Sequence, residues 1–211
     1  MKDNKTEVGA PFDRTTYFFV RHGQTDWNVQ GKVQGHTDIP LNDIGKQQAR
    51  TLKKMLDEIR FSACISSDMQ RAVETASIVV ENYSFDVSKD STLRTTHYGV
   101  FEGASWEEFN KMTPEQRAFI EQEQDERIKK FLTDKAQNAS EKNVLVVTHG
   151  SVMCRLLIVV LNLHVASAGG IGIDNAGGIR IDNTAYVQMY FSGSKWIVEK
   201  MVGITLPEVQ K

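Results

Sequence analysis

Residues 17–35 read YFFVRHGQTDWNVQGKVQG, and the change of character after the fourth letter decides the fold. The run Thr16–Val20 is short, apolar and rich in aromatic and β-branched side chains, which is typical of a buried strand. It is followed by Arg21 and His22, two side chains that are costly to bury without a partner. A pair of this kind at the end of a buried strand indicates a ligand-binding position rather than a packing position.

The composition of the chain suits one globular domain. It has 211 residues, of which 40% are hydrophobic, so it can form a substantial core. The formal net charge of -2 and the pI near 6.2 argue against general binding to nucleic acid or to an anionic membrane, which needs a basic face. No apolar leader opens the sequence, and its most apolar run, 156–166, is shorter than the ~20 residues that span a bilayer. We therefore expect a single cytoplasmic domain over residues 1–211, with a flexible stretch at 1–14.

A second strand ends in the same way as the first. Residues 144–147 are consecutive valine and leucine side chains, and the letters THG follow them. A helix is expected to begin at once, at Ser151. In an open α/β sheet, ligands bind beyond the carboxyl ends of parallel strands, where helix N-termini also point. The pattern therefore predicts that His22 and His149 meet at one edge of the sheet.

The other elements alternate between strands and helices. A capping box formed by Ser67 and Gln70 is expected to open a helix that carries Arg71 in its first turn, close to the same edge. The alternation indicates an α/β fold, a three-layer α/β/α sandwich with a mostly parallel sheet and an antiparallel edge. The remaining predicted segments are a helix from Asn42 as N-cap to about 58, with Ala49, Leu52, Met55, Leu56 and Ile59 on one face, a strand at 63–65, and a hairpin of 185–191 and 196–201.

Residues from about 104 to 140 are expected to form a small helical cap. A start signal at Thr113, followed by proline and by Gln116, predicts a long helix. Its middle is polar on all sides, so the charged run 121–130 is interpreted as a solvated helix face. The glycine-rich segment 169–178 is expected to be a loop, and it lacks the GxGxxG spacing of a dinucleotide site.

Two imidazoles, two guanidiniums and helix N-termini at one place would suit a phosphate dianion. A neutral imidazole can attack phosphorus, and its pKa of about 6.5 is lowered when arginines lie beside it. Arg21 and Arg71 would offer paired donors to the phosphate oxygens, and His149 would add another. This chemistry needs no metal or other cofactor. Zinc is not expected, because no two histidines have helical i,i+4 spacing and no cysteine cluster exists.

Three blocks of sequence carry a resemblance to a known family. In order they read VRHGQTDWN, SSDMQRAVETA and VVTHGS, each at a predicted strand end. They closely resemble the histidine phosphatase superfamily, also called phosphoglycerate mutase-like, from about residue 17 to 191. The resemblance implies that His22 is a phosphohistidine nucleophile. The other roles that it implies are phosphate-clamping arginines at Arg21 and Arg71, the second histidine at His149, and substrate-binding positions at Asn28, Gln34, Thr95 and Gly150.

One block departs from the pattern of this family. The family supplies a leaving-group acid as a glutamate two residues after a leucine, whereas LRTTHYGVFEG at 93–103 has Thr95 in that place. A threonine hydroxyl cannot serve as a general acid at neutral pH. Three explanations stay open: another residue is the acid, the substrate has a leaving group that needs none (an acyl phosphate or a phosphohistidine), or the chain is a weakly active or inactive phosphate-binding module. The candidates for another acid are His97, Glu102 and Asp26.

The short cap favours a hydrolase over a mutase. Only the stretch between Gly103 and Val144 is available to cover the site, and a mutase must exclude water from its phosphoenzyme. The sequence thus predicts a metal-independent phosphomonoester hydrolase for a small phosphorylated metabolite or a phosphoprotein, with no nucleic-acid or membrane partner. A phosphoglycerate mutase-type phosphotransferase is the alternative. His36 and His164 are interpreted as structural.

Overall fold

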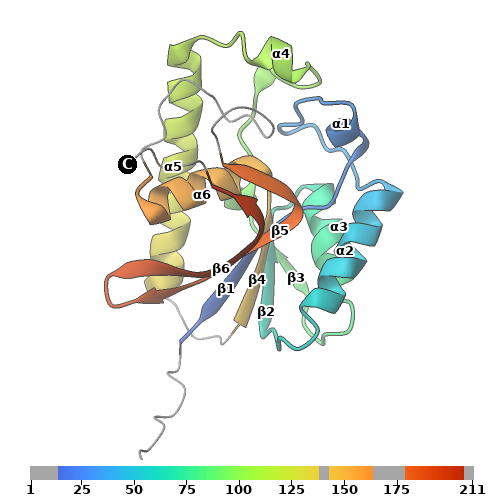
Figure 1. Cartoon of the computed structure of the whole chain (residues 1–211), viewed down its shortest axis with the longest axis vertical. Coiled ribbons are helices and arrows are strands. Elements are labelled where there is room, and N and C mark those ends of the chain that lie inside the picture. Colours follow the sequence, from blue (N-terminus) through green and yellow to red (C-terminus); the bar gives the residue numbers. More distant parts are fainter. Residues whose placement is uncertain (1–13, 138–142, 164–178, 207–211) are drawn as a thin grey trace, which may run out of the picture.

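The computed structural model describes residues 14–137, 143–163 and 179–206. Within this part of the chain, one six-stranded mixed sheet carries helices on both faces (Figure 1), which confirms the predicted α/β sandwich. The expected loop at 169–178, His164 and all of the stretch 1–14 except its last residue lie outside the described residues. The strands are β1 (Thr16–Arg21), β2 (Ala63–Ser66), β3 (Val87–Lys89), β4 (Asn143–Thr148), β5 (Arg180–Ser192) and β6 (Lys195–Thr205), and the helices are α1 (Asp26–Val29), α2 (Asp43–Met55), α3 (Gln70–Val79), α4 (Trp106–Phe109), α5 (Pro114–Gln137) and α6 (Gly150–Leu161), with short 3₁₀ turns η1 (Ser91–Leu93) and η2 (Gly99–Phe101).

The strand order brings the two histidine-bearing strand ends together. The order is β3-β2-β4-β1-β5-β6, in which β1 to β4 run parallel and the β5–β6 hairpin joins antiparallel to β1. Arg21 pairs with Thr148 in the register of β1 and β4, so His22 and His149 follow at matching positions. The hairpin is longer than predicted, because it already begins at Arg180.

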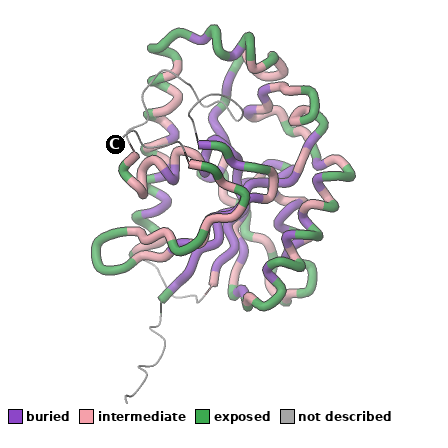
Figure 2. The backbone as a smooth tube through the Cα atoms, viewed as in Figure 1, coloured by how far each residue is buried: buried purple, intermediate pink, exposed green. Residues whose placement is uncertain are grey.

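Each face of the sheet has its own core. Side chains along β1 point alternately to opposite faces. Tyr17 and Phe19 pack with α5 and α6, whereas Phe18 and Val20 pack with α2 and α3. All of β1 is buried, and Figure 2 shows the buried strands at the centre of the molecule. A strand buried on both faces reads as a continuous apolar run, which is why this one can be recognised from sequence.

The helix α2 follows its prediction with two exceptions, the first of which is that it ends at Met55, so Ile59 lies beyond it. Its N-cap is Asn42, whose side chain accepts a 2.8 Å hydrogen bond from the amide of Gly45. Ala49 and Leu52 are buried, but Met55, expected on the same face, is 55% exposed. The expectation for Met55 was wrong because this last helical residue lies at the flank of the buried stripe.

The long helix α5 corrects the interpretation of its charged middle. It begins with the predicted capping box of Thr113 and Gln116. The run 121–130 is not simply a solvated face, because Gln124 is fully buried and Asp125 accepts bonds of 2.8 and 2.6 Å from Arg155 of α6. These polar side chains face a second helix, and a charge pattern alone does not reveal such a partner. The end of α5 joins the main core through Ile128, Phe131 and Leu132.

A smaller hydrophobic cluster connects the loop after α1 with α4 and the start of α5, in the upper part of Figure 1. Val33, Tyr98, Phe109 and Met112 are buried in it. The boundaries of a cap at about 104–140 remain a prediction. None of the described helices is both long and apolar enough to cross a membrane.

Candidate active site

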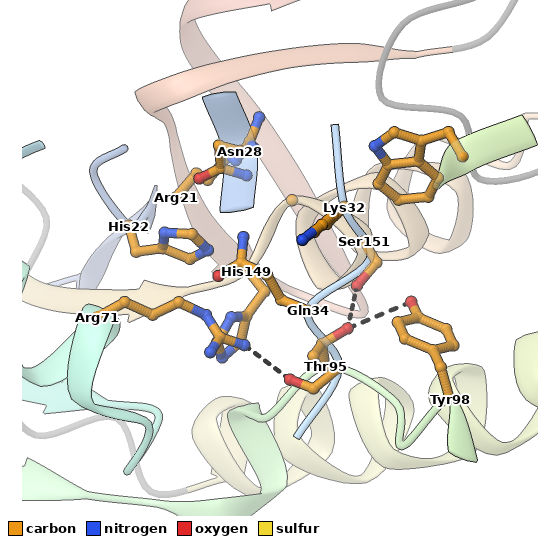
Figure 3. Close-up of a pocket in the computed structure, with 13 residues that line it drawn as sticks. Arg21, His22, Asn28, Lys32, Gln34, Arg71, Thr95, Tyr98, His149 and Ser151 are labelled. Atoms are coloured by element: carbon orange, nitrogen blue, oxygen red, sulfur yellow. Dashed lines mark hydrogen bonds between the residues drawn. The ribbon is translucent and has the colours of Figure 1, made fainter. Parts of the chain in front are cut away.

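A pocket lies at the carboxyl ends of β1 and β4, where the two predicted histidines meet (Figure 3). The ring centroids of His22 and His149 are 5.2 Å apart, and Arg71 joins them from the first turn of α3. The substrate-binding positions named from the sequence line the same pocket. Its lining comprises Arg21, His22, Asn28, Lys32, Gln34, Gly35, Arg71, Thr95, Tyr98, Trp106, His149, Gly150 and Ser151.

Contacts with the backbone select one tautomer of His22. Its Nδ1 lies 2.7 Å from the carbonyl oxygen of Gly23, and because a carbonyl only accepts, Nδ1 carries the proton. Nε2 is then the unprotonated nitrogen. The amide of His22 donates to Thr148 over 2.9 Å, and its carbonyl oxygen accepts a 3.1 Å bond from Asn183 of β5. Both strands beside β1 therefore hold the nucleophile predicted from sequence.

The glycine after His22 is required by a close approach of two segments. A Cβ on Gly23 would lie 2.5 Å from the carbonyl oxygen of Gly45 in α2, which is too close for any real side chain. The amide of Gly23 donates to Thr75 Oγ1 of α3 over 3.0 Å. The carbonyl that orients the imidazole is thus fixed by both helices on this face of the sheet.

An irregularity in β5 accommodates Arg21. The pairing of β5 with β6 shifts register between Ile181 and Tyr186, and the Ile181 carbonyl oxygen accepts a hydrogen bond from Arg21 Nη1. Such irregularities occur beside active sites, where they re-aim side chains. On the other side of the guanidinium, a Cβ on Gly150 would lie 3.2 Å from Arg21 Nε. Glycine at this position lets the guanidinium approach the start of α6 closely.

Arg71 is fully buried and serves a loop as well as the pocket. Its Nη2 and Nη1 donate to the carbonyl oxygens of Gly35 and Thr37 over 2.8 and 3.0 Å. Its Nε has no partner among the described residues. Burial lowers the pKa of the guanidinium to about 10, so it stays charged at neutral pH. A buried, unpaired donor of this kind is a group that a bound anion would satisfy.

His149 is held by a serine for which the sequence suggested another role. The capping box predicted for Ser67 is wrong: α3 begins after Met69, which makes no side-chain cap, and Ser67 Oγ lies 2.9 Å from His149 Nε2. Asp68 and Met69 separate Ser67 from α3, and the Ser67 hydroxyl contacts the His149 ring instead of capping the helix. His149 Nδ1 is buried and has no partner in the described part of the chain.

Burial and the arginines favour the neutral form of both imidazoles. Burial is the main reason that the pKa of His22 lies well below 6.5, and Arg71 and Arg21 lower it further. The pKa of His149 is also well below 6.5, first through burial and then through Arg71. A neutral imidazole is the form that can act as a nucleophile.

Asn28 and Gln34 add amide groups to the pocket. Asn28 Oδ1 accepts a 3.1 Å bond from the amide of Thr25 in the capping box of α1, which leaves Asn28 Nδ2 as a donor. Gln34 Oε1 is buried and lacks a partner among the described residues. Both side chains therefore have polar atoms available for a ligand.

Thr95 belongs to a buried cluster of hydroxyl groups. Its Oγ1 lies 2.7 Å from Ser151 Oγ and 3.3 Å from the hydroxyl of Tyr98, and Figure 3 draws both bonds. Gln124 Nε2 of α5 donates to Ser151 Oγ over 3.1 Å. Burial raises the pKa of Tyr98, so its hydroxyl stays protonated. Among the described residues that line the pocket there is no aspartate or glutamate.

The three candidate acids lie outside the lining of this pocket. Glu102 accepts bonds of 2.6 Å from the Thr37 hydroxyl and 2.9 Å from the amide of His36. Although burial raises the pKa of Glu102, these bonds outweigh that effect and hold it below its usual value. His97 is mostly exposed beside Glu102, and Asp26 is exposed on α1. Glu102 therefore orders a loop and is poorly suited to donate a proton.

Sequence reasoning missed five residues of the pocket lining, which are Lys32, Gly35, Tyr98, Trp106 and Ser151. Lys32 and Gln34 flank the fully buried Val33 in an extended stretch, so alternation is the signal that places both on one side. Tyr98 and Ser151 belong to quoted motifs, but only the fold brings their hydroxyls together. His36 is interpreted as structural from the sequence. Its Nε2 forms a 2.9 Å hydrogen bond with the carbonyl oxygen of Thr95.

The assembled pocket is strongly cationic. Arg21, Lys32 and Arg71 supply positive charges, and the described lining contains no carboxylate, although the charges of Asp38 and Glu102, outside the lining, act on Arg71. The N-terminus of α6 at Gly150 adds a partial positive charge. This arrangement can bind a multiply charged anion, and Nε2 of His22 can attack it. Within the described ranges, no three His, Cys, Asp or Glu side chains come together as metal ligands would.

Comparisons with known proteins agree with the fold and with the motifs. The family model for the histidine phosphatase superfamily (branch 1) matches residues 17–202. The chain is 36% identical over 151 residues to phosphoglycerate mutase-like protein 4 of Arabidopsis thaliana, spanning 64% of this chain and 66% of that protein. It is 32% identical over 164 residues to the metal-independent phosphoserine phosphatase of the same plant, spanning 70% and 69%.

Among solved structures, YhfR of Bacillus stearothermophilus matches with a TM-score of 0.72 and 26% identity, over 87% of this chain and 95% of that one. The residues matched by the family model include the whole lining of the pocket. The curated relatives carry the names of phosphatases and of mutases, so the family is fixed more firmly than the reaction. The chain belongs to branch 1 of the histidine phosphatase superfamily.

Proposed function

We propose that the chain is a metal-independent phosphomonoester hydrolase that acts through a phosphohistidine on His22. One observation carries the proposal: Arg21, Arg71 and His149 share a single pocket with the unprotonated Nε2 of His22. The similarity to a phosphoserine phosphatase named as metal-independent supports it.

In the first step, the lone pair of His22 Nε2 attacks phosphorus. The P–O bond of the ester breaks, and the leaving oxygen takes the bonding electrons. The proton on Nδ1 stays hydrogen-bonded to the Gly23 carbonyl oxygen, which stabilises the positive charge that the ring gains as the N–P bond forms. In the second step water attacks phosphorus and the N–P bond breaks, which restores the neutral imidazole and releases inorganic phosphate.

The unpaired polar groups of the pocket would bind the transferred phosphoryl group. Arg71 Nε and His149 Nδ1 lack partners among the described residues, and Asn28 Nδ2 is a third donor. A hydrogen bond from Ser67 Oγ to His149 Nε2 would keep the proton on Nδ1, the donor needed here. Phosphoryl transfer depends on positioning and on charge stabilisation at the equatorial oxygens, which is what these donors offer.

The leaving-group side of the pocket favours activated esters. Thr95, Tyr98 and Ser151 contribute hydroxyls, which are too weakly acidic to protonate a leaving oxygen efficiently at neutral pH. Aryl and acyl phosphates, whose leaving groups depart as stable anions, are therefore the expected substrates. Simple alkyl phosphates should react slowly.

Turnover of p-nitrophenyl phosphate in the presence of EDTA tests the proposal. The wild-type protein should release nitrophenol and form a phosphoenzyme that is stable in alkali and labile in acid. His22→Ala should lower kcat by about 10⁴-fold or more and abolish the phosphoenzyme. His97→Ala is the matched control, because this exposed histidine lies outside the pocket lining, and it should retain activity. Undiminished turnover in His22→Ala would refute the proposal.

Thr95 motivates a second candidate, a phosphate-binding module without turnover. It predicts calorimetric binding of inorganic phosphate together with no turnover even of acyl phosphates. The mutase-type alternative predicts that bisphosphoglycerate phosphorylates His22 and that the phosphoryl group then passes to phosphoglycerate. Detection of the phosphoenzyme distinguishes the binding module, which leaves His22 unmodified, and transfer of the phosphoryl group to phosphoglycerate distinguishes the mutase.

A further inference from the structure

We infer that Lys32 binds a second anionic group, carried by the leaving-group part of the substrate. The preferred substrates would then be phosphomonoesters with a carboxylate or a similar anion near the ester oxygen. The inference rests on the proposed function, because it concerns the same pocket.

Backbone contacts aim Lys32 into the pocket. The amide of Lys32 donates to the carbonyl oxygen of Trp27 over 2.9 Å, and Lys32 forms an antiparallel bridge with Ser105. The next amide, that of Val33, donates to Ala104 over 2.9 Å. Because Val33 is fully buried in the small cluster, alternation along the extended stretch turns Lys32 the other way, and Figure 3 shows its ammonium group in the pocket.

The lysine has no anionic partner in the described part of the protein. It takes part in none of the ion pairs found there, and its ammonium lies 5.8 Å from the ring centroid of Trp27. No aspartate or glutamate belongs to the described pocket lining. A cation held over a pocket in this way is available to a ligand.

The described lining of the pocket holds one cation more than the two negative charges of a phosphate monoester. A monoester dianion brings two negative charges, which Arg21 and Arg71 can balance. Lys32 is a third cation, and Figure 3 shows it on the side of Ser151, across the pocket from Arg71. Ser151 belongs to the hydroxyl cluster that we assign to the leaving group. A negative charge on the leaving group is therefore what this lysine would recognise.

A matched pair of substrates tests the inference. Carboxyphenyl phosphate and carbamoylphenyl phosphate have nearly the same size, but only the first carries a second charge. The ortho, meta and para isomers of both would be compared by kcat/KM with the full chain. The wild-type protein should prefer the carboxylate in at least one isomer by about tenfold to a hundredfold, the range expected for a charged hydrogen bond.

The variants then locate the source of this preference. Lys32→Gln should bring the ratio of kcat/KM between the two substrates close to one, mainly through a higher KM for the carboxylate. Lys32→Arg should keep the preference. Lys195→Gln, which removes the same charge from the exposed first residue of β6, should leave the ratio unchanged.

Two results would overturn the inference. If Lys32→Gln lowers kcat/KM for both substrates equally, the lysine binds the transferred phosphoryl group. If it changes neither, the lysine has no role in recognition. Calorimetric binding of the matching carboxybenzyl and carbamoylbenzyl phosphonates gives the same comparison without turnover, so a failure of the proposed hydrolysis is separable from a failure of the lysine contact.

Discussion

The pocket has two ends. At the end where we propose that the phosphoryl group binds, the phosphate end, the side chains come from adjacent strand ends and the start of one helix. At the end where we propose that the leaving group lies, the leaving-group end, they come from separate segments. Arg21, His22 and His149 follow the register of two neighbouring parallel strands. Thr95, on the other hand, meets Ser151 of α6 and, through it, Gln124 of α5. The first arrangement depends on the sheet, and the second depends on how α5, α6 and a loop pack.

The two ends also differ in how their polar groups are satisfied. At the phosphate end, Arg71 Nε and His149 Nδ1 are buried without partners among the described residues. At the other end, the hydroxyls of Thr95, Tyr98 and Ser151 bond to one another. Under the proposed function, phosphate recognition depends on the strand ends of the sheet, and the groups beside the leaving group can change without disturbing it.

Among the changes that test this difference between the two ends, the largest expected effect comes from placing an acid at the leaving-group end. Thr95→Glu should raise kcat/KM for alkyl phosphates by about 10²–10⁴-fold, the usual contribution of general acid catalysis. Aryl phosphates, which need little protonation, should gain much less. Steady-state kinetics with a series of esters whose leaving groups differ in pKa measures both effects. In Thr95→Glu, kcat/KM should depend less steeply on the leaving-group pKa than in the wild-type protein. Glutamine has the same shape as glutamate but lacks the acidic proton, so Thr95→Gln should give no gain in kcat/KM. A similar gain in both variants would show that size, and not acidity, is responsible.

Removing a cation from the phosphate end should change kcat/KM by a somewhat smaller factor than the Thr95→Glu substitution. Arg71→Met should lower kcat/KM by about 10²–10³-fold for every ester, because a charged donor to the transition state is lost. Arg71 also holds the loop at Gly35 and Thr37, so thermal unfolding should be measured beside activity. Arg71→Lys keeps the charge and helps to separate the two roles. Arg94→Met, which breaks a surface ion pair with Asp68, is the control and should leave kcat/KM nearly unchanged.

The smallest expected effect is a near absence of pH dependence. Because the pKa of His22 is held well below 6.5, kcat/KM for an aryl phosphate should fall little as the pH drops through 6.5.

The free energy of unfolding, in contrast, should depend on pH. Below pH 6.5 the unfolded chain binds protons that buried His22 and His149 do not, so the free energy of unfolding should decrease as the pH falls. Urea denaturation across this range measures the slope, and His22→Gln should reduce it. A loss of activity centred at 6.5 would contradict the lowered pKa.

The sequence predicts the sheet, and the meeting of side chains at the ends of β1 and β4, for a physical reason. Strands buried on both faces and glycines at tight approaches, such as Gly23, leave strong local signals. The role of Ser67 could not be predicted, because its capping signal is local while its contact with His149 is made between distant segments. Lys32 was missed although alternation with Val33 marks it, since the stretch is too short to be recognised as a strand.

The loop at 35–37 is tied from two sides: Arg71 binds its carbonyl groups, and Glu102 binds its amides. These hydrogen bonds all form within the protein, so folding alone orders the loop beside the proposed anion site. An anion site that is ordered before binding favours the inorganic phosphate product as much as the ester substrate. Release of the product should therefore compete with chemistry for control of the turnover rate, and accumulated phosphate should slow the enzyme by occupying this site.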